Sequence, residues 1–272
     1  MGHGVDFFKD YLLGSYRIYG SRINNQVLIP PSKILVDLAI NYGWSKKKII
    51  KINLPRWDRY SQVDHYFSGN ITNNSILVMF TWRQTKRWYG YTEISEIYHQ
   101  NIIKLLEDKN LHETLQKYNF TLYFSLHRLV NKKYIRKYDE AIQRIENLKF
   151  LKQNEISECL AKTNLVVSDF SSVIFDLMSR GKPFVIYIPD AEDKTIKTSY
   201  SNDYVKLIER MINGKIKFKN KCFSIKETVN KVISFIENIF EIEPELKKFY
   251  DKFHFKINNN TNEFIDYLIH LK

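Results

Sequence analysis

The stretch "VVSDFSSVIFDLMSRGKPFVIYIP", residues 166–189, decides the fold. An apolar run ends in Ser-Asp, a segment with helical spacing follows, and Gly-Lys-Pro leads into a second apolar run. Two buried strands joined through a helix are the repeating unit of a parallel sheet. Three serines and two aspartates lie between residues 168 and 176, more than helix capping accounts for. The stretch therefore predicts a strand–helix–strand unit with a polar site after its first strand.

The same alternation continues on both sides of this stretch. Apolar runs predict strands at 75–80 and 120–127. Helical patterns occupy 93–118, 156–163 and 225–240, and residues 138–152 are predicted as a helix followed by a short strand. Strands that alternate with helices are typical of a parallel, doubly wound α/β sheet. One complete α/β domain is therefore predicted from about Ser75 to Phe240.

A shorter α/β pattern precedes this domain. Strands are predicted at Val27–Ile29 and Ile49–Ile52, with a helix that begins after Ser32 between them. Residues 60–75 are polar and predict a loop or linker. The His-Gly pair at residues 3–4 has no strand before it, so we expect a piece of a longer protein.

The chain is basic, with 42 Lys and Arg against 30 Asp and Glu and a formal net charge of +12. This balance favours an anionic partner, namely nucleic acid, an acidic membrane surface or a phosphate-rich substrate; the alternative is a basic solvated surface. Cys159 and Cys222 have no ligand-like spacing, which argues against a zinc site and fits a reducing compartment. No run approaches the roughly 20 apolar residues that span a bilayer.

Ligands bind at the carboxyl ends of the strands in a doubly wound sheet, which selects the residues that follow each apolar run. These candidates are Thr81, Trp82, Arg83, Ser125, His127, Ser168, Asp169, Ser171 and Ser172. Ser171 and Ser172 begin a helix, where unpaired N–H groups and the helix dipole favour an anion; N-capping is the alternative. Asp176 lies four residues beyond Ser172, on the same helix face, and suits a sugar hydroxyl.

Three candidates, His127 from this set and two others, have weaker local signals. His127 suits proton transfer or a phosphate contact, with a structural edge histidine as the alternative. Arg56 in "LPRWD" suits a phosphate through its planar fork, with an ion pair to Asp58 as the alternative. His3 precedes Gly4, which lets a ligand approach the backbone closely, and the alternative is a tag remnant.

Taken in order, these motifs resemble the CDP-glycerol glycerophosphotransferase family, which includes wall teichoic acid polymerases and related capsule enzymes. The resemblance rests on "HG" at 3–4, "LPRWD" at 54–58, "TWR" at 81–83, "LH" at 126–127 and "SDFSSVIFD…GKPFVIYIPD" at 168–190. It implies a GT-B fold, in which two Rossmann-like halves hold the donor nucleotide between them. Residues 1–60 would then end the first half, 61–245 form the CDP-donor-binding domain and 246–272 form C-terminal helices.

The resemblance also implies roles for individual residues. His3 corresponds to the family's general base, and His127 to a second essential histidine at the donor's phosphates. No metal ligands are expected. The residues assigned to substrate binding are Gly4, Arg56, Thr81, Trp82, Ser125, Ser171, Ser172 and Asp176. The resemblance gives no ligand to Ser168 and Asp169, which are assigned to shaping the turn.

The function implied is transfer of glycerol phosphate, or a related alditol phosphate, from a CDP-linked donor to an acceptor hydroxyl, with release of CMP, in teichoic acid or capsular polymer synthesis. The donor is a substrate, and no cofactor is expected. Expected partners are the donor, a polyol-phosphate or lipid-linked saccharide acceptor and an anionic membrane surface, but no nucleic acid. The expected location is cytoplasmic, peripheral at the inner face of the bacterial membrane. A homo-oligomer or a separate N-terminal half would complete the cleft.

Two alternatives stay open. The same fold serves GT-B glycosyltransferases and epimerases that use a UDP-sugar. A chain with only the end of a first half would alternatively be a non-catalytic half that binds nucleotide, membrane or a partner.

Overall fold

The fold is taken from a computed structural model of the protein. The structure describes residues 36–37, 40, 44–51, 53, 55–61, 71–81, 84–87, 90–93, 96–127, 130, 132–169, 171, 173–191, 219–253 and 260–270. The site candidates His3, Gly4, Trp82 and Ser172, and the predicted strand at 27–29, lie outside these residues.

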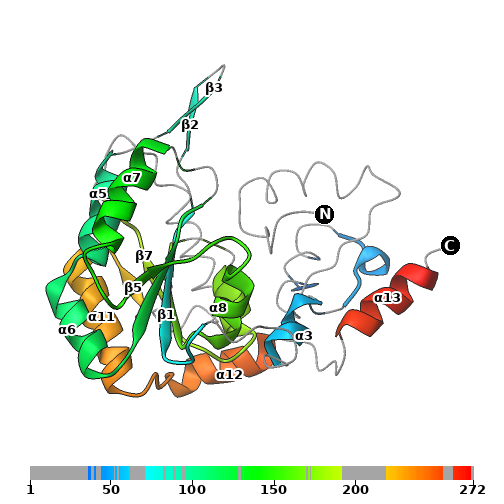
Figure 1. Ribbon diagram of the computed structural model, residues 1–272. Helices are drawn as coiled ribbons and strands as arrows, with labels where there is room; N and C mark the ends of the chain where they lie inside the picture. Colours follow the sequence, from blue (N-terminus) through cyan, green and yellow to red (C-terminus); the bar gives the residue numbers. More distant parts are fainter. Residues whose placement is uncertain are drawn as a thin grey trace.

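A six-stranded parallel sheet forms the centre of this part of the chain (Figure 1). Its strands are β1 Ser75–Met79, β4 Thr121–Ser125, β5 Leu148–Phe150, β6 Leu165–Ser168, β7 Phe184–Tyr187 and β8 Lys221–Cys222. They lie in the order β5-β4-β1-β6-β7-β8, and all five pairings are parallel. When these six strands are numbered along the chain, this is the 3-2-1-4-5-6 order of a Rossmann-type sheet. Its switch point, where the strand order reverses, lies between β1 and β6. The predicted doubly wound α/β fold is confirmed.

Alternate side chains of each strand enter separate cores on the two faces of the sheet. In β1, Leu77 packs in one core, whereas Ile76 and Val78 pack in the other. All three side chains are buried. Because both faces are covered, the strands are continuous apolar runs rather than alternating apolar and polar residues.

Helices form a layer on each face of the sheet (Figure 1). One core is covered by α5 Glu96–Leu106, α6 Lys109–Lys117, α7 Lys132–Ile142 and α11 Ile225–Glu237. The other core is covered by α3 Arg56–Ser61, α8 Ile156–Lys162, α9 Val173–Met178 and α12 Pro244–Phe253.

Four local features differ from the sequence interpretation. The helix predicted to begin at Tyr138 begins earlier, as α7 Lys132–Ile142. The single helix predicted at 93–118 is two helices, because the Asp108 side chain accepts a hydrogen bond from the Leu111 N–H at 3.0 Å and starts a new helix. The strand predicted at 49–52 is not formed by residues 49–51, which follow a 3₁₀ helix at Lys46–Lys48 and contribute only one isolated bridge. An antiparallel hairpin, β2 Gln84–Arg87 and β3 Gly90–Glu93, was not predicted and projects from the body of the domain (Figure 1).

The helix α13 Asn260–His270 returns to the N-terminal part of the chain and lies beside α3 (Figure 1). The Asp58 carboxylate on α3 accepts hydrogen bonds from the Thr261 backbone N–H at 2.7 Å and from its hydroxyl at 2.6 Å. Helix α13, which follows the sheet domain in the chain, therefore contacts helix α3, which precedes it.

Candidate functional site

The candidate site lies at the carboxyl edge of the sheet, where three neighbouring strands end. Strands β4, β1 and β6 are adjacent in the sheet, so the residues that follow them share one rim, as the topological rule predicts. The described candidates at this rim are Thr81, Ser125, His127 and Ser171. Their contacts with a ligand stay a prediction.

Asp169 connects the ends of β1 and β6 across the switch point. Its carboxylate accepts hydrogen bonds from the Thr81 backbone N–H at 3.0 and 3.2 Å and from the Thr81 hydroxyl at 2.6 Å. The Ser168 hydroxyl donates to the Met79 carbonyl, and the Tyr98 hydroxyl donates to the Thr81 carbonyl. Ser168 and Asp169 are fully buried and shape the rim, in agreement with the sequence interpretation.

The orientation of Thr81 has a chemical consequence. Because its hydroxyl proton points to the Asp169 carboxylate, the Thr81 oxygen is left with acceptor capacity only. A ligand group that meets this oxygen must therefore be a hydrogen-bond donor.

Ser171 forms the turn that leads into α9. Its hydroxyl oxygen accepts a hydrogen bond from the Val173 N–H at 3.4 Å, and its carbonyl accepts one from the Ile174 N–H at 3.4 Å. Capping of the first helical turn, the alternative weighed for these serines, is thus present at Ser171.

Ser125 ends β4 and is 1% exposed. Its hydroxyl is buried and makes no hydrogen bond to any residue that the structure describes. Buried hydroxyls are normally satisfied, so this group is available to a water molecule or a ligand at the rim. Two residues later, the His127 carbonyl accepts a hydrogen bond from the Val130 N–H at 2.9 Å, which fixes the backbone after the strand.

A second group of candidates joins α3 to α9. The Asp176 carboxylate, in a residue only 5% exposed, accepts hydrogen bonds from Arg56 Nε at 2.8 Å and Arg56 Nη2 at 3.1 Å. It also accepts one from the indole N–H of Trp57 at 2.8 Å, a residue that the sequence interpretation missed. The fork of Arg56 therefore holds Asp176, 120 residues away in the chain. Asp58, the ion-pair partner weighed as the alternative, accepts hydrogen bonds from Thr261.

Burial and charge act against each other in this group. Burial opposes the charge on Arg56, but the Asp176 carboxylate beside it raises the pKa of Arg56 above its ordinary value. Burial raises the pKa of Asp176, and Arg56 and Trp57 offset part of that rise. Burial also lowers the pKa of the nearby Arg180 to about 10. The Arg56 side chain is 35% exposed, so its outer face still reaches solvent.

The fold and the rim together define a class of protein. A Rossmann-type sheet with donors and acceptors at its switch point is a nucleotide-binding architecture. Residues 25–266 match the model of the CDP-Glycerol:Poly(glycerophosphate) glycerophosphotransferase family. The chain belongs to this family, which confirms the resemblance seen in its motifs.

Relatives with known names agree with this assignment. The chain is 23% identical over 243 residues to the minor teichoic acid biosynthesis protein GgaB of Bacillus subtilis (strain 168), a match that covers 85% of this chain and 24% of GgaB. It resembles the structure of the wall teichoic acid polymerase TagF with a TM-score of 0.57 and 17% identity, covering 96% of this chain and 60% of that one. A TagF variant soaked with CDPG gives a TM-score of 0.59 and 16% identity, covering 96% and 59%. The chain therefore spans about a quarter of GgaB and three fifths of TagF.

Proposed function

We propose that the protein transfers glycerol phosphate, or a related alditol phosphate, from a CDP-linked donor to an acceptor hydroxyl and releases CMP. The family match over residues 25–266 is the observation that carries the proposal. The names of GgaB and TagF support a cell-surface phosphopolymer, teichoic acid or a capsular polymer, as the product.

In the proposed reaction, the acceptor oxygen forms a bond to the β-phosphorus of the donor. The bond from that phosphorus to the oxygen that bridges the α- and β-phosphates breaks, and CMP leaves with the bridging oxygen. His3 takes the acceptor's proton. His127, after β4, and Arg56 stabilise the charge on the transferred phosphoryl group. The partly exposed guanidinium of Arg56 supports this role, because the Asp176 pair holds it in one orientation.

The remaining candidates would orient the donor. The Thr81 oxygen accepts a hydrogen bond from a hydroxyl group of the CDP-linked substrate, because the proton of Thr81 is itself donated to Asp169. The buried hydroxyl of Ser125 gains a partner when the rim is occupied. The other residues proposed to bind substrate are Gly4, Trp82, Ser171, Ser172 and Asp176.

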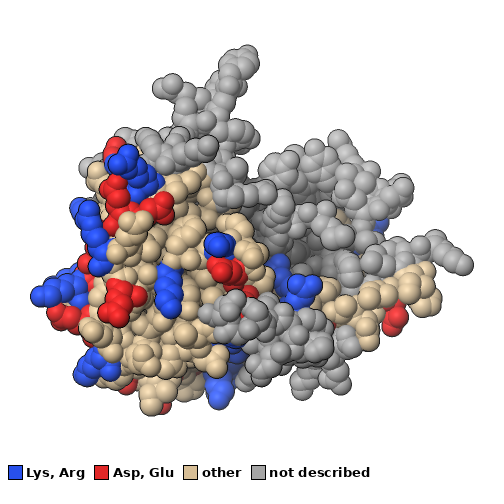
Figure 2. All heavy atoms as spheres, viewed as in Figure 1, with Lys and Arg blue, Asp and Glu red and all other residues tan. Residues whose placement is uncertain are grey.

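The proposed location is the inner face of the bacterial membrane. In the part of the chain that the structure describes, no helix combines the length and the apolar character needed to cross a membrane. The net charge of +12 suits anionic lipid and a polyanionic acceptor. On the face in Figure 2, the described cationic and acidic side chains are interspersed rather than gathered into one basic patch. Attraction through the overall field is therefore the form of contact we propose.

CMP release from CDP-glycerol, with a polyol-phosphate acceptor, tests the proposal. His127→Ala is expected to lower turnover at least about 100-fold with an unchanged melting temperature. The exposed His270→Gln on α13 is the matched control and should keep full turnover. Full turnover in His127→Ala would contradict its assigned role.

Ligand-dependent melting separates the alternatives. CDP-glycerol or CDP-ribitol should raise the melting temperature, since a ligand that binds only the folded state stabilises it. Stabilisation by UDP-sugars alone would favour a UDP-sugar enzyme. Stabilisation by CDP-glycerol without any CMP release would favour a non-catalytic half.

A further inference from the structure

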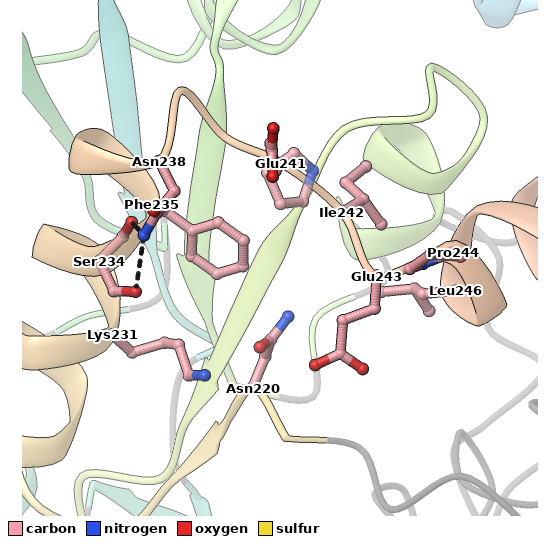
Figure 3. Close-up of a pocket in the computed structure, with 11 residues that line it drawn as sticks. Asn220, Lys231, Ser234, Phe235, Asn238, Glu241, Ile242, Glu243, Pro244 and Leu246 are labelled. Carbon is pink, nitrogen blue, oxygen red and sulfur yellow. Dashed lines mark hydrogen bonds between the residues drawn. The ribbon is translucent and has the colours of Figure 1, made fainter.

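A cavity of about 350 Å³ lies at the opposite, amino edge of the sheet (Figure 3). Pro183 and Asn220, which directly precede β7 and β8, contribute to its wall, together with the end of α11 and the start of α12. Its size falls within the range of small-ligand pockets, about 300–1,000 Å³. The candidate transferase site lies at the carboxyl ends of the same parallel strands, so the two sites are separate.

Asn220 is the central polar group of this cavity. The residue is 8% exposed, and its side-chain amide makes no hydrogen bond to a described residue. Its backbone carbonyl accepts the Ile186 N–H at 2.8 Å, which fixes the residue against β7. Figure 3 shows the amide pointing into the cavity between Lys231 and Glu243. A buried amide in this position offers one acceptor oxygen and two donor hydrogens to a ligand.

A cation and a carboxylate lie on either side of this amide (Figure 3). Lys231 on α11 makes no ion pair with a described residue, and its ammonium reaches toward Asn220. Glu243 pairs with the more exposed Lys219 at 3.1 Å and keeps further acceptor capacity. In the wall of this cavity, the Asn238 amide donates a hydrogen bond to the Ser234 carbonyl at 2.7 Å, which leaves the amide oxygen of Asn238 as an acceptor. Glu241 also lines the cavity, so its wall carries two carboxylates and one ammonium group beside the two amides. Donors and acceptors are thus mixed, with an excess of negative charge.

The rest of the wall is apolar. The ring of Phe235 and the side chains of Ile242 and Leu246 face the cavity across from the polar groups (Figure 3). A phosphate would gain from Lys231 but would meet the carboxylate of Glu243. Hydroxyl groups both donate and accept, so they match a mixed set, and the C–H face of a sugar ring matches an aromatic ring.

We propose that this cavity binds a neutral sugar ring, with its hydroxyls on Asn220, Lys231 and Glu243 and one face against Phe235. The inference rests on the cavity alone and does not depend on the proposed transferase function. The cavity would then be a carbohydrate-binding site at the amino edge of the sheet, separate from the candidate transferase site at the carboxyl edge.

Amide chemical shifts of the full chain, titrated with methyl α-D-glucopyranoside, test this inference. Saturable shifts are expected in the segments 219–221 and 231–246. Asn220→Ala and Lys231→Met should each weaken binding about five- to tenfold, the loss of one hydrogen bond. Lys226→Met, an exposed residue on the same helix outside the cavity, should leave the affinity unchanged. Ribitol, an open-chain polyol, should bind more weakly because it presents no ring face to Phe235.

Three results would overturn the proposal. Absence of saturable shifts in these segments would reject the site. Equal shifts with inorganic phosphate would identify an anion site, and equal affinity for ribitol would remove the role of the ring. If Asn220→Ala does not fold, Lys231→Met still decides, since its side chain lies at the surface of α11 and is only partly buried.

Discussion

Removal of the Asp176 carboxylate should weaken the attachment of α3 to α9. In Asp176→Ala, the guanidinium of Arg56 loses hydrogen bonds at 2.8 and 3.1 Å, and the indole N–H of Trp57 loses an acceptor at 2.8 Å. Breaking a fully buried ion pair costs about 3–5 kcal/mol. Because the Arg56 side chain is 35% exposed, water replaces part of that interaction. With about 1 kcal/mol for the Trp57 hydrogen bond, we expect the free energy of unfolding to fall by about 3 kcal/mol.

A double-mutant cycle isolates the pair. Urea unfolding of Asp176→Ala, Arg56→Met and the double variant should give a coupling energy of about 1.5–3 kcal/mol. The matched control is the Arg136–Glu140 pair on α7, which has a similar distance of 3.0 Å but side chains that are 85% and 51% exposed. Its coupling should stay below about 0.5 kcal/mol. If the Arg56–Asp176 coupling is no larger than that of the surface pair, the reasoning about this buried pair is wrong.

Three further changes test other features. Asp169→Ala should lower the free energy of unfolding by about 2–3 kcal/mol in thermal denaturation, because it leaves the N–H of Thr81 without this acceptor. Ile239→Gly should raise the free energy of unfolding by about 0.5 kcal/mol, because glycine adopts the positive φ of 52° at this position without the steric cost of a side chain. The Ile239 side chain is 86% exposed, so little packing is lost; no gain in urea unfolding would contradict this. Hydrogen bonds from the Phe223 and Ser224 N–H groups lower the pKa of Glu227, so its contribution is present above about pH 4.5 and is lost as the pH falls through the lower folded pKa. Glu227→Gln should therefore lose less stability on acidification, measured by melting temperature from pH 6 to 3.

The sheet and the location of the rim could be predicted because their signals are local. Strands buried on both faces are continuous apolar runs, and parallel strands place their carboxyl ends on one edge. Thr81, Ser125 and Ser171 were placed at the rim by this rule alone. The start of α6 also had a local signal in Asp108, but the helical patterns on both sides of it were interpreted as one long helix. Strand β8 has only two residues, too few to show the alternation of apolar and polar side chains from which a strand is predicted.

The contacts between these elements could not be predicted, because they depend on packing rather than on neighbours in the chain. Asp58 lies two residues from Arg56 and was the only partner that sequence spacing offered. The fold instead brings Asp176 to Arg56 across 120 residues. The same holds for Asp169, which reaches Thr81 across 88 residues only because β1 and β6 are adjacent.

The contact between Asp58 and Thr261 has a consequence for folding during synthesis. The two residues are 203 positions apart, and the whole sheet domain lies between them in the chain. On the ribosome, α3 is made early but cannot complete its packing until α13 has emerged. The central domain, whose contacts are more local, is expected to fold first. Helix α3 would then stay accessible to proteases and chaperones for longer than the sheet domain in the nascent protein.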